Sequence, residues 1–512
     1  MVRVDTPSGA LEGERQGGAA IFRGIPYARP PVGSRRFRAP EPAAPWTGTR
    51  LARSFRSSAP QSAPMLPLLG RLIGGTAPGQ SEDCLYLNVW TPAPDPRRRP
   101  VLVWIHGGAF VMGSGSSALY SGRRLAVRGD VVVVTLNYRL GALGFLNLRG
   151  LVPHGDDVPS NLGLRDQIAA LEWVQRHIEC FGGDPENVTL MGESAGAMSV
   201  GTLLGTPRAQ GLFGRAILQS GAAHNVASRE QAAHVAESLL REVGVDALDA
   251  GGLEKLSLSA LLRAQRKVGL SLGARGGLMA WQPSLDDDLL TTPPLRTIES
   301  GLSKSVPVLI GTNRDEWRLF LWGDPQGRRL DPAGLRRRIE RSLQPAPSRD
   351  VDLAVELYSR PRLDRGRPTP TDSWVDFQTD RIFRYPATRL AEIQSRHVPE
   401  TYAYLFNWRP PLLRTRLGAA HGVEIPFVLG SLRRRELRPL IGWSPSALRL
   451  CDRMQQAWAH FARTGRPECD LLPDWPAYDP ERRATQILGS DCFVEDAPLE
   501  ETRRFWEGRL DR

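Results

Sequence analysis

The 512-residue sequence predicts an α/β fold, with a large, mostly parallel central sheet and helices on both of its faces. Three observations lead to this prediction. Strand-like and helical stretches alternate through the first half of the chain, which is typical of βαβ units. Residues 101–105, Val-Leu-Val-Trp-Ile, form a continuous apolar run, as expected for a strand covered on both faces. Residues 187–198 pass from a β-branched strand through a sharp turn into small residues that can start a helix.

One helix is predicted over residues 163–180, where apolar side chains recur at helical spacing. These side chains are Leu164, Ile168, Leu171, Val174 and Ile178. Asn161 can cap the first turn, and Gly182 and Gly183 stop the helix. Residues 228–280 are rich in Ala, Leu, Arg and Glu, which predicts helices inserted over the sheet.

The turn at residues 192–196 reads Gly-Glu-Ser-Ala-Gly, the Gly-x-Ser-x-Gly pattern of a nucleophile elbow. A strand-to-helix turn of this kind exposes the Ser194 hydroxyl over the end of a sheet, and the glycines avoid crowding in the turn. The pentapeptide alone also occurs in ordinary turns. Here the strand before it and the helix start after it favour the elbow.

The apolar run at 101–105 leads directly into His106, Gly107, Gly108 and Ala109. A His-Gly-Gly loop at this place lends backbone N–H groups to a developing oxyanion. The alternative is a simple glycine turn after a buried strand, which would not require His106 or the later glycines. His106 precedes the serine in the chain, so we expect it to brace the loop rather than to act as a base.

A serine nucleophile on this type of fold is followed in the chain first by its acid and then by its base. Five histidines follow the serine: His224, His234, His397, His421 and His460. His421 sits in a small-residue loop that can hold an imidazole exposed, whereas His460 lies in a helical pattern and is expected to be structural. His224 and His234 come before every good acid candidate. Among these histidines, the loop position favours His421 as the base, and His397 is not set aside by this argument.

The acid is expected just after a strand, and residues 306–311 form such a strand. It leads into Asp315 and Glu316. Strand position alone leaves both carboxylates open as the acid.

With these segments together, the chain resembles the type-B carboxylesterases, the cholinesterase and bacterial p-nitrobenzyl esterase branch of the α/β-hydrolases. The matching segments lie at residues 22–28, 36–37, 81–89, 137–141, 161–167, 181–185 and 219–221. The similarity runs from about residue 3 to about residue 495. It implies an α/β-hydrolase fold with helical insertions over the active site. Length alone would suggest about three domains, but the candidate residues must converge, so a single domain over residues 1–512 is expected.

The resemblance assigns the three central roles. Ser194 matches the nucleophile, and His421 matches the general base that later acts as general acid. Glu316, rather than Asp315, matches the acid. In such a triad the imidazole takes the serine proton, and the carboxylate holds the imidazole tautomer and stabilises its charged form.

Two further groups of residues are implied by the same resemblance. The oxyanion donors match the N–H groups of Gly108, Ala109 and Ala195. A buried polar cluster that braces the histidine loop matches Glu193, Ser220 and Glu424. No cofactor and no metal are implied.

Two positions depart from the family pattern. Trp317 stands after the acid where the family usually has glycine, so it adds bulk near the mouth of the site or packs under it. The family pairs the cysteine at position 84 with an earlier one, and Ala59 stands at that earlier place. Cys84 is therefore expected to be a free thiol.

The cellular compartment is predicted from cysteine use and from the N-terminus. Five cysteines in 512 residues, an odd number without metal-like spacing, suggest reduced thiols. Residues 1–9 enter a strand-like segment without the apolar core of a signal peptide, and no apolar run approaches the roughly 18 residues of a membrane span. These features predict a cytoplasmic protein.

The net charge of +11 raises the question of nucleic-acid binding. The basic residues are 66 in number, and only Lys255, Lys267 and Lys304 are lysines. Short, scattered arginine runs without interleaved aromatic residues do not favour a nucleic-acid partner. The base composition of the gene explains the arginine excess more simply.

The sequence thus predicts a cofactor-free serine carboxylesterase that cleaves uncharged, fairly apolar esters through an acyl-serine intermediate. An amidase or peptidase with the same triad remains an alternative, as does a non-catalytic adhesion or scaffold relative of the fold. The apolar segment 65–79 could form a lid over the active site or pack on the protein's own surface. The oligomeric state and the physiological ester stay undetermined.

Overall fold

The computed structural model describes residues 1–62, 79–151, 158–244, 250–274, 279–345, 347–361, 366–411 and 417–510. Within these ranges, thirteen strands form one sheet with the order β1-β2-β3-β5-β7-β6-β8-β9-β10-β11-β12-β13, and β4 pairs with β2. The strands are β1 (Val2–Thr6), β2 (Gly9–Gln16), β3 (Ala19–Pro26), β4 (Thr49–Leu51), β5 (Tyr86–Thr91), β6 (Arg99–Ile105), β7 (Val132–Leu136), β8 (Gly183–Glu193), β9 (Arg215–Gln219), β10 (Val308–Asn313), β11 (Thr401–Phe406), β12 (Ala484–Leu488) and β13 (Phe493–Asp496).

The centre of the sheet is parallel and its edges are antiparallel. Strands β7, β6, β8, β9, β10, β11 and β12 pair in parallel, whereas β1–β2–β3–β5–β7 and β12–β13 pair antiparallel. Every residue of β6 and β7 is buried, which explains their nearly continuous apolar sequences. The predicted large, mostly parallel sheet is confirmed.

Helices cover both faces of this sheet, as the sequence predicts. They are α2 (Arg123–Gly129), α3 (Gly141–Phe145), α4 (Leu162–His177), α5 (Ala195–Leu204), α6 (Arg229–Val243), α7 (Ala250–Lys255), α8 (Leu258–Ala274), α9 (Pro294–Glu299), α10 (Pro332–Leu343), α11 (Ser348–Ser359), α12 (Pro370–Thr379), α13 (Tyr385–Ser395), α14 (Ile425–Val428), α15 (Arg438–Ile441), α16 (Pro445–Thr464) and α17 (Glu500–Trp506). Apolar side chains of α4, α5 and α13 share one core with the sheet, and those of α2, α14 and α16 share the core on its other face.

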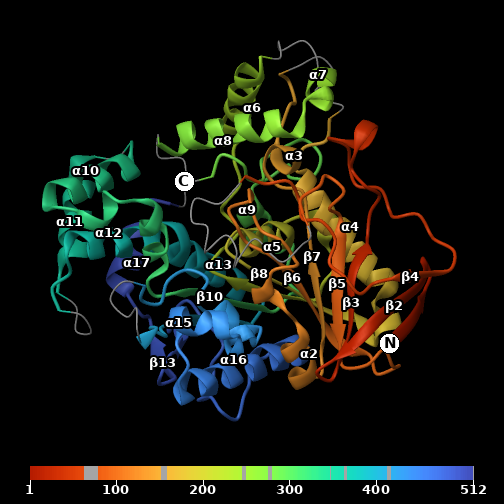
Figure 1. Cartoon of the computed structure of the whole chain (residues 1–512). Helices are drawn as coiled ribbons and strands as arrows, with labels where there is room; N and C mark the ends of the chain where they lie inside the picture. Colours follow the sequence, from red (N-terminus) through yellow and green to blue (C-terminus); the bar gives the residue numbers. More distant parts are fainter. Residues whose placement is uncertain are drawn as a thin grey trace.

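Two groups of helices lie outside these layers (Figure 1). Helices α6 and α8 pack on α3 through a small apolar cluster of their own, and α10, α11 and α12 form another with α17. The helices predicted over residues 228–280 are confirmed where the structure describes them. The 65–79 segment lies almost wholly outside the described residues.

The helix predicted over 163–180 is present as α4, followed by a 3₁₀ turn at Ile178–Phe181. Asn161 stands at the N-cap position of this helix, but the prediction that its side chain caps the first turn is wrong. Asn161 has a left-handed backbone with φ 54°, and its side chain makes no capping hydrogen bond. Its side-chain amide instead donates to the Ser284 carbonyl at 2.8 Å and to the Asp286 carboxylate at 2.7 Å. The side chain is therefore used to join α4 to a distant loop.

The prediction of a free thiol at Cys84 is confirmed, since Cys84 is buried and unpaired. Ala59, which stands where the family has the partner cysteine, is buried as well. The other four cysteines are also free. Among the described residues, no helix has the length and apolar character needed to span a membrane.

Candidate active site

The candidate nucleophile lies at the junction of β8 and α5. Ser194 has φ 56° and ψ −127°, a backbone conformation that is unfavourable for a residue with a side chain. The junction is held by two backbone hydrogen bonds, from Ser194 N–H to the Gln219 carbonyl and from Met198 N–H to the Ser194 carbonyl, both 2.9 Å. A Cβ atom at position 196 would clash with the Ile105 carbonyl oxygen, so glycine is required there. The predicted elbow geometry is present.

The loop after β6 packs directly against this elbow. A Cβ atom on Gly107 would lie 2.9 Å from the Ser194 Cβ. Gly108 and Ala109 both have positive φ, 116° and 52°, which turns the loop backbone over the serine. The N–H groups of Gly108, Ala109 and Ala195 donate no hydrogen bond to any residue that the structure describes. They are free to bind an oxyanion.

His106 braces this loop from below. Its ring stacks on Tyr138 with centroids 4.5 Å apart, and its Nδ1 lies 2.9 Å from the Gly107 carbonyl oxygen. Burial lowers the pKa of His106 to about 4, which keeps the ring neutral. The predicted bracing role fits these contacts.

The candidate acid and base meet between the end of β10 and the histidine loop. His421 Nδ1 lies 2.7 Å from Glu316 Oε2. Glu316 is fully buried, and its Oε1 accepts the Asn313 backbone N–H at 2.7 Å. The backbone N–H of His421 also donates to the backbone carbonyl of Glu316, at 3.3 Å. Both oxygens of the carboxylate are thus occupied, one by the backbone and one by the imidazole.

Asp315 has a different partner from Glu316. Its Oδ2 accepts the Ala419 N–H at 2.9 Å, and its own N–H donates to the Ala419 carbonyl at 2.9 Å. It makes no side-chain capping bond to the 3₁₀ turn Glu316–Arg318 that follows it. Asp315 therefore secures the histidine loop, while Glu316 contacts the imidazole.

The second ring nitrogen of His421 faces Glu193. Its Nε2 lies 3.2 Å from Glu193 Oε1. Between Ser194 and His421, both of which the structure describes, there is no hydrogen bond in this arrangement. Burial raises the pKa of Glu193 and outweighs the opposite effect of His421. Burial alone would lower the pKa of His421, but Glu193, Glu316 and Glu424 together raise it.

Glu424 is held by two residues that the sequence did not single out. Gln219 Nε2 donates to Glu424 Oε1 at 3.1 Å, and Asn313 Nδ2 donates to Glu424 Oε2. Gln219 is in turn fixed by Trp458, whose Nε1 donates to Gln219 Oε1 at 3.1 Å. The Ser220 hydroxyl is buried and has no hydrogen-bond partner among the described residues.

A sequence signal for these two residues exists. Gln219 and Asn313 are the last residues of neighbouring parallel strands, β9 and β10. The carboxyl ends of such strands form the edge at which sites are built. Buried polar side chains at that edge are candidates for the site, whatever motif surrounds them.

Two aromatic rings also pack close to the His421 imidazole. The ring centroids of Phe320 and Phe383 lie 5.3 Å and 4.8 Å from that of His421. The Trp317 and Phe320 ring centroids lie 4.6 Å apart, and the backbone N–H of Trp317 donates to Thr379 Oγ1 at 3.2 Å. Phe320 remains 37 % exposed. The imidazole is therefore flanked by apolar rings, and one of them, Phe320, is partly exposed to solvent.

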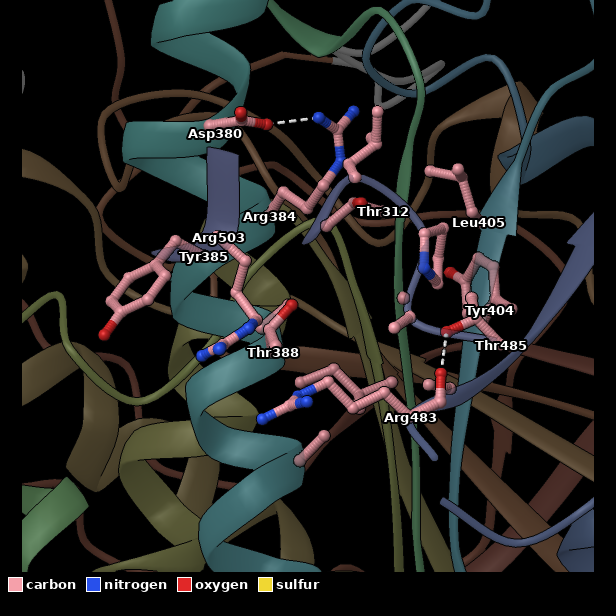
Figure 2. Close-up of a pocket in the computed structure, with 18 of the residues that line it drawn as sticks. Thr312, Asp380, Arg384, Tyr385, Thr388, Tyr404, Leu405, Arg483, Thr485 and Arg503 are labelled. Atoms are coloured by element: carbon pink, nitrogen blue, oxygen red, sulfur yellow. Dashed lines mark hydrogen bonds and ion pairs between the residues drawn. The ribbon is translucent and has the colours of Figure 1, made fainter. Parts of the chain in front are cut away.

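A separate cavity of about 60 Å³ lies between β10, β11 and α13 and is shown in Figure 2. Thr312, Arg384 and Thr388 are among its lining residues, and none of Ser194, Glu316 and His421 lines it. No group of three or more acidic, histidine or cysteine side chains suited to a metal ion occurs within the described ranges.

A parallel sheet whose strand ends carry a serine elbow, an acid loop and a histidine loop, in that chain order, defines the α/β-hydrolase class. The model of the Carboxylesterase family matches residues 1–506, and the chain belongs to this family.

Two relatives of known activity are similar over nearly their whole length. The para-nitrobenzyl esterase of Bacillus subtilis (strain 168) is 38% identical over 508 residues, covering 98% of this chain and 97% of that protein. The phenmedipham hydrolase of Pseudarthrobacter oxydans is 37% identical over 503 residues, covering 95% and 94%.

Solved structures give the same result. A thermophilic para-nitrobenzyl esterase superposes with a TM-score of 0.86 at 38% identity, covering 98% of this chain and 99% of the other. The Geobacillus stearothermophilus carboxylesterase Est55 at pH 6.2 has a TM-score of 0.87 at 39% identity, covering 99% and 100%. The predicted family and α/β-hydrolase fold are confirmed, and the chain is a carboxylic ester hydrolase.

Proposed function

We propose that Ser194, His421 and Glu316 form the catalytic triad of this carboxylesterase, and that Gly108, Ala109 and Ala195 supply its oxyanion hole. The observation that carries the proposal is the 2.7 Å contact between His421 Nδ1 and a fully buried Glu316 carboxylate, beside the strained serine elbow. A base whose imidazole is oriented by a carboxylate is the arrangement that activates a serine hydroxyl.

In the first half of the reaction, Ser194 Oγ attacks the ester carbonyl carbon and its proton passes to His421 Nε2. The carbonyl oxygen becomes an oxyanion bound by the three free N–H groups. The C–O bond to the alcohol then breaks, and His421 gives its proton to the leaving alkoxide. This leaves an acyl group on Ser194.

In the second half, water attacks the acyl carbon while His421 accepts a water proton. Collapse of the second oxyanion releases the carboxylic acid and returns the proton to Ser194. The imidazolium formed in each half lies between Glu316, at 2.7 Å, and Glu193, at 3.2 Å. Both carboxylates favour the charged ring.

The proposed substrates are uncharged, fairly apolar esters. Phe320 and Phe383 beside the imidazole provide apolar contacts for the substrate. The buried Glu316 carboxylate beside the imidazole disfavours an anionic group near the reacting carbonyl. The names of the para-nitrobenzyl esterases make para-nitrobenzyl esters suitable first substrates.

The test replaces the nucleophile. Ser194→Ala is expected to keep its fold and to lose nearly all turnover of p-nitrophenyl esters, since only oxyanion and binding effects remain. A fluorophosphonate probe should label the wild-type enzyme at Ser194, as mapped by peptide mass spectrometry. Turnover of the Ala variant within about 10-fold of wild type would refute the assignment. A chain-length series of esters, with matched anilides, then separates esterase from amidase activity.

The proposal also includes the cellular location, the binding partners and the number of domains. A cytoplasmic location is supported by the five free thiols. A small ester, and no nucleic acid, is the proposed partner, because the basic residues are scattered in short runs. One domain over residues 1–512 is supported by the single sheet that joins β1 to β13.

A further inference from the structure

Asn313 makes contact with three parts of the candidate site at once. It is the last residue of β10 and is fully buried. Its backbone N–H donates to Glu316 Oε1 at 2.7 Å. Its side-chain Nδ2 donates to the Ala420 carbonyl at 2.8 Å and to Glu424 Oε2. The backbone of Asn313 thus holds the acid, while its side chain holds the loop of the base.

Both side-chain bonds bear directly on the base. Ala420 is the residue before His421, and Glu424 is the residue that ends the same loop. The Asn313 side-chain amide therefore binds one residue before His421 in the chain and one residue after it. When the Asn313 amide is oriented in this way, its buried Oδ1 has no hydrogen-bond partner among the described residues, which is unfavourable. An amide kept in this costly orientation indicates that both donated bonds are needed.

We propose that Asn313 is a positioning residue for the general base, which fastens the His421 loop and the Glu424 carboxylate to the strand end that carries Glu316. This role rests on the proposed function of Glu316 and His421. Asn313 touches neither the reacting atoms nor the oxyanion hole, so it acts only through the groups that it holds.

The charged groups around His421 determine in which direction its pKa should change when the Asn313 side chain is removed. The ionisable groups that face Glu424 and His421 come from several elements: Glu193, Glu316, Tyr120 and Tyr404. Burial raises the pKa of Glu424, then Glu316 raises it further, and the Asn313 hydrogen bond opposes both. Without that bond Glu424 binds a proton more readily. Less negative charge then faces His421, and the pKa of His421 falls.

The experiment compares two variants of Asn313 with a matched control. Asn313→Ala removes both side-chain donors, and Asn313→Thr restores one. The control is Thr312→Val, which removes a polar group one residue earlier on β10, where the side chain faces the cavity shown in Figure 2 instead of the histidine loop. None of the three substitutions removes the backbone N–H of residue 313 that donates to Glu316 in the wild-type protein.

For Asn313→Ala we expect kcat to fall about 10- to 100-fold with KM within about 2-fold of wild type, because a base held less well slows the chemical step and leaves ester binding intact. The acid limb of the kcat/KM profile should move to lower pH by about half a unit or more. Asn313→Thr should recover part of kcat, and Thr312→Val should retain the wild-type profile.

A purely structural role for Asn313 would lower stability and active fraction but leave the pH profile in place. An acid limb that does not move in Asn313→Ala overturns the inference, and so does a loss of kcat no larger than that of Thr312→Val. If Asn313→Ala does not fold, the same two criteria apply to Asn313→Thr. Failure of the triad itself is seen separately, as activity retained by Ser194→Ala.

Discussion

Replacing Glu316 by Gln tests the candidate acid with almost no change in shape. The wild-type carboxylate accepts two hydrogen bonds, one from the Asn313 backbone N–H and one from His421 Nδ1, each at 2.7 Å. A glutamine has one acceptor oxygen and one NH₂ group for these two places. One of the two partners must therefore meet a donor instead of an acceptor.

The chemistry of the two partners, the Asn313 backbone N–H and His421 Nδ1, determines which of them faces the glutamine NH₂ group. A backbone N–H cannot release its hydrogen, whereas an imidazole can move its proton from one nitrogen to the other. The glutamine oxygen is thus expected to face Asn313, and its NH₂ group to face His421 Nδ1. The ring proton then sits on Nε2, the nitrogen that must accept the Ser194 proton in the proposed mechanism.

The size of the effect follows from this wrong tautomer. In a serine protease, the Asp→Asn change that produces the wrong tautomer costs about 10⁴ in kcat. Glu193, 3.2 Å from Nε2, still favours a charged ring here and offsets part of the loss. We therefore expect Glu316→Gln to lower kcat by between about 10² and 10⁴.

Asp315→Asn is the matched control. The wild-type Asp315 Oδ2 accepts the Ala419 N–H at 2.9 Å, and an asparagine oxygen can accept the same bond. The His421 tautomer is not involved, so kcat should fall less than about 10-fold. Steady-state kinetics on a p-nitrophenyl ester and thermal melts of both variants give the comparison. Abolished turnover in Asp315→Asn with near-normal turnover in Glu316→Gln would show that the acid is one residue away from its proposed position.

The sequence predicts those parts of the site that are built from short segments. The elbow at residues 192–196 and the loop at 106–109 each require a particular backbone path within a few residues. Glycines allow that path, so their positions in the sequence reveal it. The buried parallel strands that carry them are equally visible, because strands covered on both faces must be apolar throughout.

Contacts between distant segments are not visible in this way. Asn161 has the residue type and position of a helix cap, yet its amide binds Ser284 and Asp286, more than 120 residues later in the chain. Gln219 and Asn313 hold Glu424 across 205 and 111 residues of sequence. Local propensity describes what a side chain can do near its own position, and tertiary packing determines which partner is present.

The choice between Asp315 and Glu316 has the same physical origin. Both follow β10, and strand position alone does not separate them. The path of residues 417–421 separates them, since it brings Ala419 N–H to one carboxylate and the imidazole to the other. The same path places His421 Nε2 next to Glu193. No sequence pattern around His421 or around Glu193 predicts this contact.

Two further predictions concern a buried ion pair and the pH dependence of turnover. Arg139 and Asp166 are both buried and joined by two side-chain hydrogen bonds of 2.8 Å and 2.7 Å. Asp166→Ala leaves the guanidinium uncompensated and should lower the free energy of unfolding by about 3–5 kcal/mol in denaturant titrations, and a loss below about 1 kcal/mol would contradict this. For turnover, burial lowers the pKa of His421, but the surrounding carboxylates raise it above its ordinary value of 6.5. The base must be neutral to accept the Ser194 proton, so kcat/KM should fall as the pH decreases through this raised pKa. The acid limb measured on a neutral ester is therefore expected above pH 6.5. A limb below that value would mean that the carboxylates around His421 are protonated in the free enzyme and do not hold a charged ring.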